Sequence, residues 1–190
     1  MSLEYLKEQI NKYIPYNEQE EMDKTLMLEF IDKNENCLTR ESRAGHFTAS
    51  NWIVNKDRTK VLMIYHNIYK SWAWTGGHAD GDENLLHVAL KEAEEESNLK
   101  NLKPLVDGIF SLESLTVDGH VKRGKYVSSH LHLNCSFLFE ADEQEELKIK
   151  EDENSGVKWL DIDKVIDLVR EENMKPIYAK LNQKLLELGI

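Results

Sequence analysis

Four glutamates are crowded at the end of one short segment of the chain: Glu92, Glu94, Glu95 and Glu96. The residues before them predict a helix, on which positions 92, 95 and 96 share one edge. Like charges at this spacing repel one another, and the helix dipole disfavours carboxylates near a C-terminus. A cation would relieve the repulsion, and three converging carboxylates form a hard oxygen site suited to Mg²⁺ or Mn²⁺. Glu94 projects from a different face, so we expect it to be solvated.

The spacing of these glutamates belongs to a longer pattern that begins at Gly77. Five residues separate Gly77 from Glu83, and seven more lead to the run Lys91-Glu92-Ala93-x-Glu95-Glu96-x-Asn98-Leu99. These 23 residues resemble the Nudix box, whose family pattern is G-x5-E-x7-R-E-U-x-E-E-x-G-U, with U an aliphatic residue. The resemblance implies an α/β fold, the Nudix-type α/β/α sandwich with a mixed sheet, and a Nudix pyrophosphohydrolase activity that depends on a divalent metal ion.

The family resemblance implies which residues hold the metal ion. Glu92, Glu95 and Glu96 match the carboxylate ligands, and a backbone carbonyl of the glycine turn, at Gly76 or Gly77, commonly completes such a site. Glu92 matches the glutamate that is most often implicated as a ligand and, in some relatives, as the general base. The implied cofactor is therefore Mg²⁺ or Mn²⁺.

Two positions depart from the family pattern. Lys91 stands where the family has arginine, so the charge is kept but the planar fork that can hold two carboxylates is lost. Glu83 and Lys91 match a catalytic-site pair that braces the loop against the helix, and a weak surface ion pair is the alternative. Asn98 replaces a glycine at the predicted helix C-cap, where asparagine is the next best residue at positive φ.

Candidate substrate-binding residues lie on both sides of the pattern. Trp74 and His78 flank the glycine turn and are candidates to contact the substrate. A core tryptophan and a structural histidine hydrogen bond are the alternatives. Glu153 precedes the last predicted strand and is a candidate further metal ligand or base, the alternative being a solvated acidic turn.

The segment 118–129 is locally basic and precedes two histidines on a predicted strand. Arg123 and Tyr126 are candidates for contacts with phosphate and with a base or ring, and an exposed hairpin tip is the alternative. His130 and His132 share one strand face and could bind a metal such as Zn²⁺. Because no third ligand accompanies them in the sequence, we interpret them as sheet-face residues beside the cleft.

Composition restricts the class of partner. The chain has 190 residues, 41% hydrophobic and 31% charged, and a net charge of −11, which argues against general nucleic-acid or anionic-membrane binding. No segment approaches the roughly 20 apolar residues of a membrane span. The two cysteines, Cys37 and Cys135, lack metal-type spacing, which favours ordinary packing in a reduced cytoplasmic setting. The Nudix resemblance implies a small phosphorylated, nucleotide-derived substrate.

The resemblance implies two parts, a helical extension at residues 1–44 and a hydrolase domain at 45–190, and hydrophobic periodicity predicts helices in the extension. Pro15 separates two helices in the extension, which could cover a homodimer interface or cap the active site. The second of these helices has a predicted apolar stripe of Met22, Leu26 and Phe30. Strands are predicted at 47–54, 60–65, 72–74, 105–116, 130–139 and 157–160. Further helices are predicted at 84–97, 161–170 and 174–188. In the first of them the predicted buried stripe is Leu86, Ala89, Leu90 and Ala93, with Glu92, Glu95 and Glu96 on another face.

Two kinds of function remain open at this stage. The first is an enzyme that cleaves a diphosphate linkage in a nucleoside diphosphate joined to another group. The second is a non-catalytic Nudix-fold module that binds a nucleotide or metabolite, an alternative suggested by Lys91 and by the added helices. Isopentenyl diphosphate isomerases share the fold, but neither cysteine lies in a motif resembling theirs.

Overall fold

A parallel pair of long strands forms the centre of the sheet in the computed structural model, which describes residues 3–122 and 124–190. Strand β1 (Gly45–Val54) pairs with β9 (His130–Glu140) along its whole length, with His46 opposite His132. The pair is buried over most of its residues, as expected for strands covered on both faces. The strand order is β10-β2-β1-β9-β5. The other strands are antiparallel to their neighbours, so the sheet is mixed, as predicted.

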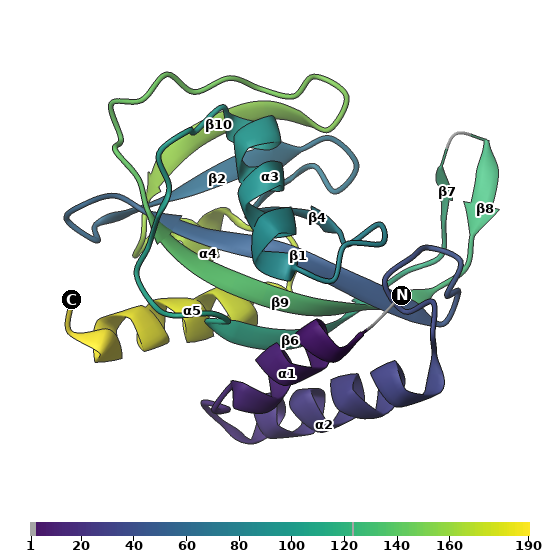
Figure 1. The fold of residues 1–190 in the computed structure, drawn as a ribbon. Coiled ribbons are helices and arrows are strands. Elements are labelled where there is room, and N and C mark those ends of the chain that lie inside the picture. The colour runs from purple at the N-terminus through teal and green to yellow at the C-terminus, as the bar shows by residue number, and fades with distance from the viewer. Residues whose placement is uncertain (1–2, 123) are drawn as a thin grey trace.

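Shorter strands extend this sheet at its ends. Strands β2 (Lys60–His66) and β10 (Asn154–Asp161) form one side, and β6 (Ser111–Val117) and β5 (Lys103–Pro104) pair with β9. Strands β3 (Ser71–Ala73) and β4 (Thr75–His78) pair with β2 and β1. A separate hairpin, β7 (His120–Lys122) with β8 (Lys125–Val127), projects away from the body of the molecule (Figure 1).

Helices cover both faces of the sheet and create two hydrophobic clusters. Helix α3 (Leu85–Ser97) packs against the face that presents Phe47 and Ala49. The short α4 (Val165–Leu168) and α5 (Lys175–Leu188) cover the face that presents Trp52 and Val54 (Figure 1). Odd-numbered β1 residues therefore face α3 and even-numbered ones face α5, because side chains alternate along a strand. This arrangement confirms the predicted Nudix-type α/β/α sandwich.

The two N-terminal helices pack against the sheet of their own chain. Helix α1 (Glu4–Lys12) buries Leu6 and Ile10, as its spacing predicts. In α2 (Glu18–Lys33) the predicted apolar stripe is wrong, because the buried apolar residues are Met27 and Ile31 while Met22 is 65% exposed. The helix lies beside β6, and this contact decides which of its faces is covered.

Three predicted elements differ from those observed. The strand predicted at 105–116 begins only at Ser111, because Gly108 turns the chain at a φ of +76°. The helix predicted at 161–170 is reduced to the single turn of α4. The glycine turn after Trp74 is itself a strand, β4, because its backbone pairs with β1.

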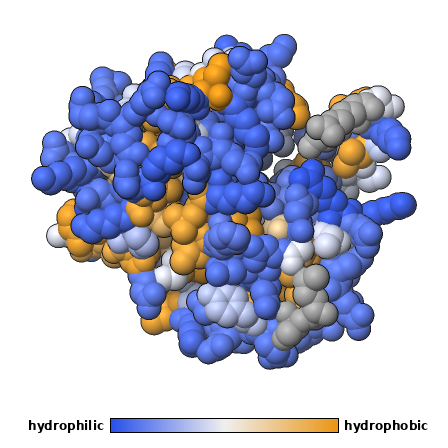
Figure 2. Space-filling model, turned by 45° about the horizontal axis from the view of Figure 1, so that its top comes forward, coloured by the Kyte–Doolittle hydropathy of each residue, from blue (hydrophilic) through white to orange (hydrophobic). Residues whose placement is uncertain are grey.

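The surface and the cysteines agree with the composition. Hydrophilic residues cover most of the face shown in Figure 2, and hydrophobic residues gather in one band below its centre. Cys37 and Cys135 are both buried and unpaired, which confirms their interpretation as packing residues. Among the described residues, no helix combines the length and the apolar character that crossing a bilayer requires.

A buried polar network joins α2, β6 and α5. The carboxylate of Glu20 is fully buried and accepts hydrogen bonds from Ser111 Oγ at 2.7 Å and from Tyr13 Oη. It also pairs with Lys180 Nζ at 2.9 Å and Lys184 Nζ at 3.0 Å. Buried charges are tolerated only with such partners. The N-terminal extension is therefore held to the sheet by charge as well as by apolar packing.

We expect this network to make stability depend on pH at the acid end. Burial alone would raise the pKa of Glu20, but Tyr13 and the two lysines lower it from 4.5 to about 2. The ionised carboxylate therefore stabilises the fold fully above pH 4.5, and this stabilisation is lost as pH falls toward 2. The lowered pKa corresponds to a contribution of roughly 3 kcal/mol to the free energy of unfolding. Burial lowers the pKa of Lys184, and the charge of Glu20 opposes this effect. Chemical denaturation of wild type and Glu20→Gln should show a stability difference that shrinks between pH 5 and pH 2. A constant difference would contradict the assignment.

Candidate active site

The helix that carries the glutamates has a defined cap at each end. The side chain of Asn84 accepts a hydrogen bond from the His87 N–H at 3.2 Å. At the other end Asn98 has a φ of 69°, and its N–H donates to the Glu94 carbonyl at 2.8 Å. This confirms the predicted left-handed C-cap. The Asn98 side chain also donates to the Glu146 carbonyl, so it tethers the loop before β10 in a way that glycine would not.

Glu96 is the most deeply buried of the glutamates and is only 2% exposed. One carboxylate oxygen accepts a hydrogen bond from the Gly76 N–H at 2.8 Å. Burial raises the pKa of Glu96 well above its usual value, and the neighbouring carboxylates of Glu92 and Glu153 raise it further. The prediction that Glu96 lies on another face than the buried stripe is therefore wrong, because Glu96 is buried along with Ala89 and Ala93.

Glu92 lies directly against Gly77. A β-carbon on Gly77 would be 2.4 Å from Cδ and from Oε1 of Glu92, closer than any real contact. The absence of a side chain at this glycine therefore creates the space that the Glu92 carboxylate occupies. Burial raises the pKa of Glu92, and the charge of Glu95 adds to the effect.

Substitution of Gly77 by alanine should displace Glu92 without unfolding the protein. The new methyl group would meet a flexible side chain, which can move, so we expect kcat/KM to fall about 10- to 100-fold. Gly81→Ala is the control, because a β-carbon there meets no atom within 4 Å although its φ of +98° makes the change costly for stability. Steady-state kinetics and thermal melts separate the two effects. Full activity in Gly77→Ala would show that the position of Glu92 is unimportant.

A lysine from the loop before β10 enters the glutamate cluster. Lys150 Nζ lies 2.8 Å from Glu95 Oε2 and 3.2 Å from Glu153 Oε2. Its hydrogen bond lowers the pKa of Glu95, and both carboxylates raise the pKa of Lys150 against the opposing effect of burial. Lys150 therefore supplies positive charge beside Glu95, where the sequence predicted repulsion between neighbouring carboxylates. No spacing in the sequence connects this lysine to α3.

Asn154 fixes the loop that carries Lys150 and Glu153. This residue is fully buried at the start of β10, and its side-chain amide donates to the Glu96 carbonyl at 3.1 Å. Its side-chain oxygen accepts from the Lys150 N–H at 3.3 Å. The end of α3 and the loop are thus held by one side chain, which places Glu153 beside the cluster.

The predicted brace between Glu83 and Lys91 is not formed among the described residues. Lys91 Nζ lies 3.8 Å from Glu95 Oε1, one helical turn away, and its side chain is 59% exposed. The Glu83 Oε2 atom is buried without a hydrogen-bond partner. An ammonium group offers no second arm to reach Glu83 while contacting Glu95, which is the physical cost of lysine at this position.

The candidate substrate residues lie in different places. Trp74 packs edge-on against Tyr178 of α5, with ring centroids 5.3 Å apart, so it belongs to the core on the face opposite α3. The His78 ring packs against the rings of His46 and His132. Tyr126 is 71% exposed on the projecting hairpin (Figure 1). Arg123 lies outside the described residues.

The carboxylate cluster has the chemistry that a hard divalent ion requires. Glu92 and Glu96 are both shielded from water, which raises the pKa of each. Among the described residues, the hydrogen bond donated to these carboxylates is the one from the Gly76 N–H to Glu96. Buried carboxylates with so few donors are stabilised by a cation, and oxygen ligands suit Mg²⁺ or Mn²⁺. The residues present therefore fit a divalent ion between the glycine turn and α3.

Comparison with known proteins gives a consistent result. Residues 45–184 match the model of the NUDIX domain. The chain is 28% identical over 140 residues to the RNA pyrophosphohydrolase of Pelagibacter ubique (strain HTCC1062), covering 72% of this chain and 88% of that protein. An Ap4A hydrolase from C. elegans, in a binary complex, superposes with a TM-score of 0.55 at 19% identity, covering 74% of this chain and 98% of that one. A NUDIX-family hydrolase from Clostridium perfringens gives 0.54 at 21% identity, with coverages of 76% and 99%.

Proposed function

The chain belongs to the Nudix family, and from this premise we propose that it hydrolyses a phosphoanhydride bond with the help of a divalent metal ion. The observation that supports the proposal is the position of Glu92 and Glu96 at the glycine turn, the first against Gly77 and the second bonded to the Gly76 N–H. Such a cluster is costly to build without a cation and is suited to the chemistry of phosphate groups. We propose Mg²⁺ or Mn²⁺ as the ion.

The proposed roles follow from position and environment. When bound, the ion would neutralise phosphate oxygens and lower the pKa of a water molecule. Glu96, buried and oriented by Gly76, would be a ligand, together with Glu92 and Glu95. We propose that Glu153, whose side chain is 40% exposed beside Lys150, accepts the proton of the attacking water. Lys150 would contact a substrate phosphate once it releases the carboxylates.

We propose a nucleoside diphosphate joined to another group as the substrate class. The net charge of −11 disfavours extended nucleic acid, so attraction of a phosphorylated substrate must be local, from the ion and Lys150. The Pelagibacter relative is named for RNA and the C. elegans structure for Ap4A, so both chemistries belong in a substrate panel.

The test is a screen in which the products are identified by mass. The full chain, freed of metal by chelation, would be incubated with nucleotide sugars, dinucleoside polyphosphates, nucleoside triphosphates and 5′-triphosphorylated RNA, with and without Mg²⁺ or Mn²⁺. We expect metal-dependent cleavage into two phosphate-bearing products, one of which carries ¹⁸O from labelled water. Unchanged substrates in every arm would overturn the proposal.

A non-catalytic binding module is the second candidate. It is favoured by Lys91, which leaves Glu83 without its partner, and by Lys150, which already neutralises part of the cluster. Calorimetry that shows tight binding of a nucleotide without turnover would support this function. Rapid hydrolysis of the same ligand would exclude it.

We propose that residues 1–44 form an extension of the hydrolase domain at 45–190 and contribute mainly to its stability. Leu6, Ile10, Met27 and Ile31 belong to the same hydrophobic cluster as residues of α3. Removal of the extension would therefore expose apolar surface and also the buried ion pair between Lys180 and Glu113. A homodimer remains a proposal, and sedimentation of the full chain measures it directly.

A further inference from the structure

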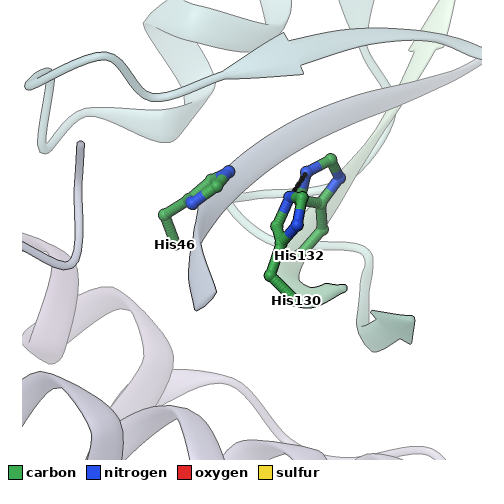
Figure 3. Close-up of side chains that lie close together, drawn as sticks. All are labelled: His46, His130 and His132. Carbon is green, nitrogen blue, oxygen red and sulfur yellow. Dashed lines mark hydrogen bonds between the residues drawn. The ribbon is translucent and has the colours of Figure 1, made fainter. Parts of the chain in front are cut away.

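Three histidines from two strands meet at the end of the sheet where β1 and β9 begin. His46 lies opposite His132 in the parallel register, and His130 lies two residues before His132 on the same strand face. Ring centroids are 4.9 Å apart for His46 and His130 and 5.1 Å for His46 and His132. Figure 3 shows the three rings facing one another across the two strands.

The nitrogen atoms of this cluster are spaced as ligands of one ion. One ring nitrogen from each of His46, His130 and His132 can be chosen so that all lie within 4.8 Å of one another. The Nε2 atoms of His130 and His132 are joined by a hydrogen bond of 3.2 Å, whose proton a shared metal ion would displace. Two nitrogens at about 2.0–2.1 Å from a tetrahedral zinc ion are separated by about 3.3 Å. The three rings would have to move together to reach this separation, because their nitrogens lie within 4.8 Å of one another.

Hydrogen bonds already orient two of the rings for coordination. His46 Nδ1 faces the Ser42 carbonyl at 3.2 Å, and His130 Nδ1 faces the Ser128 carbonyl at 2.8 Å. A carbonyl oxygen only accepts, so each Nδ1 carries the proton and each neutral ring presents an Nε2 lone pair. This is the arrangement in which metal-bound histidines are commonly held, with the other nitrogen donating to a carbonyl.

An unsatisfied buried atom points to a missing ligand. His46 is only 5% exposed, and its Nε2 atom has no hydrogen-bond partner. Leaving such an acceptor buried and unpaired carries a free-energy cost. Neutral imidazole is the form that binds metal.

We propose that His46, His130 and His132 bind a transition-metal ion of the Zn²⁺ class. Imidazole donors favour Zn²⁺, Co²⁺, Ni²⁺ or Cu²⁺ over Mg²⁺, so the site differs in chemistry from the carboxylate cluster. It also lies on the opposite face of the sheet, because His46 and His132 share the face of Trp52 and Leu138. Bound metal would tie the start of β1 to the start of β9.

Binding of cobalt provides a direct test with a readout other than activity. The full chain, freed of metal and then saturated with Mg²⁺ to occupy the carboxylates, would be titrated with Co²⁺, whose visible absorption reports nitrogen coordination. We expect one Co²⁺ per chain, displaced by Zn²⁺, and a melting temperature raised by about 5 °C when Zn²⁺ is in excess. The absence of an absorption change would overturn the proposal.

Matched variants assign the ion to the histidines. His130→Gln should weaken Co²⁺ binding at least 100-fold, whereas His120→Gln should not change it. His120 is a suitable control because its Nδ1 faces the Asp118 carbonyl two residues earlier, at 2.9 Å, as His130 Nδ1 faces Ser128. Circular dichroism checks that both variants fold, and His132→Asn replaces His130→Gln if that variant does not. Co²⁺ binding that survives the loss of the His130 or His132 ring would place the ion elsewhere and overturn the proposal. Co²⁺ binding that disappears in Glu95→Gln would do the same.

Discussion

Replacement of Glu96 by glutamine is expected to lower kcat about 10³-fold in the presence of Mg²⁺. The amide has nearly the same volume as the carboxylate and can still accept the hydrogen bond from the Gly76 N–H, so the geometry of the turn should be kept. The substitution removes a negatively charged ligand of the ion. The bound ion supplies several kcal/mol of transition-state stabilisation, so weaker binding of the ion slows the reaction. Steady-state kinetics on the substrate found in the screen measure the effect.

Stability distinguishes this loss from simple unfolding. The pKa of Glu96 is raised by burial, so its ionised form opposes folding when no metal is bound. Glu96→Gln should therefore melt at the same temperature as metal-free wild type or higher. Glu94→Gln is the control, because Glu94 lies on the same helix but pairs with Lys100 at the surface. Wild-type activity in Glu96→Gln, or an equal loss in Glu94→Gln, would refute the proposed ligand set.

Replacement of Glu20 by glutamine is expected to lower the free energy of unfolding by about 3 kcal/mol at pH 7. The change leaves Lys180 and Lys184 buried, with side-chain exposures of 7% and 9%. Among the described ion pairs, the carboxylate that remains beside them is Glu113, 3.1 Å from Lys180. A buried charge that loses its partner costs far more than a surface charge does. Chemical denaturation of the two proteins gives the difference directly.

Two further variants show that the effect belongs to the buried pair. Glu21→Gln changes the neighbouring residue of α2, which is exposed, and should alter stability by less than about 0.5 kcal/mol. The double variant Glu20→Gln with Lys184→Met should regain part of the loss, because the unpaired ammonium is removed with its partner. Strictly additive effects of the two changes would mean that the carboxylate and the ammonium do not interact.

The fold class was predictable because it follows from a local pattern. The residues from Gly77 to Leu99 contain their own turn, helix and cap, and Asn98 adopts the positive φ that the pattern requires. The central strands were also found, since β1 and β9 are long and apolar. The stripe of α2 was not, because nothing in its sequence indicates that Met27 rather than Met22 meets the sheet. Which face of a helix is covered depends on its neighbours.

The sequence by itself determined which residues are candidates for metal chemistry, because the spacing of Glu92, Glu95 and Glu96 is fixed by helix geometry. Only the tertiary structure decided their environments. It buried Glu96, brought Lys150 from a loop more than fifty residues away to Glu95, and set His46 opposite His132. These outcomes depend on strand register and on loop position. Strand register and loop position both depend on packing between segments that are distant in the sequence, so the local spacing of residues does not predict them.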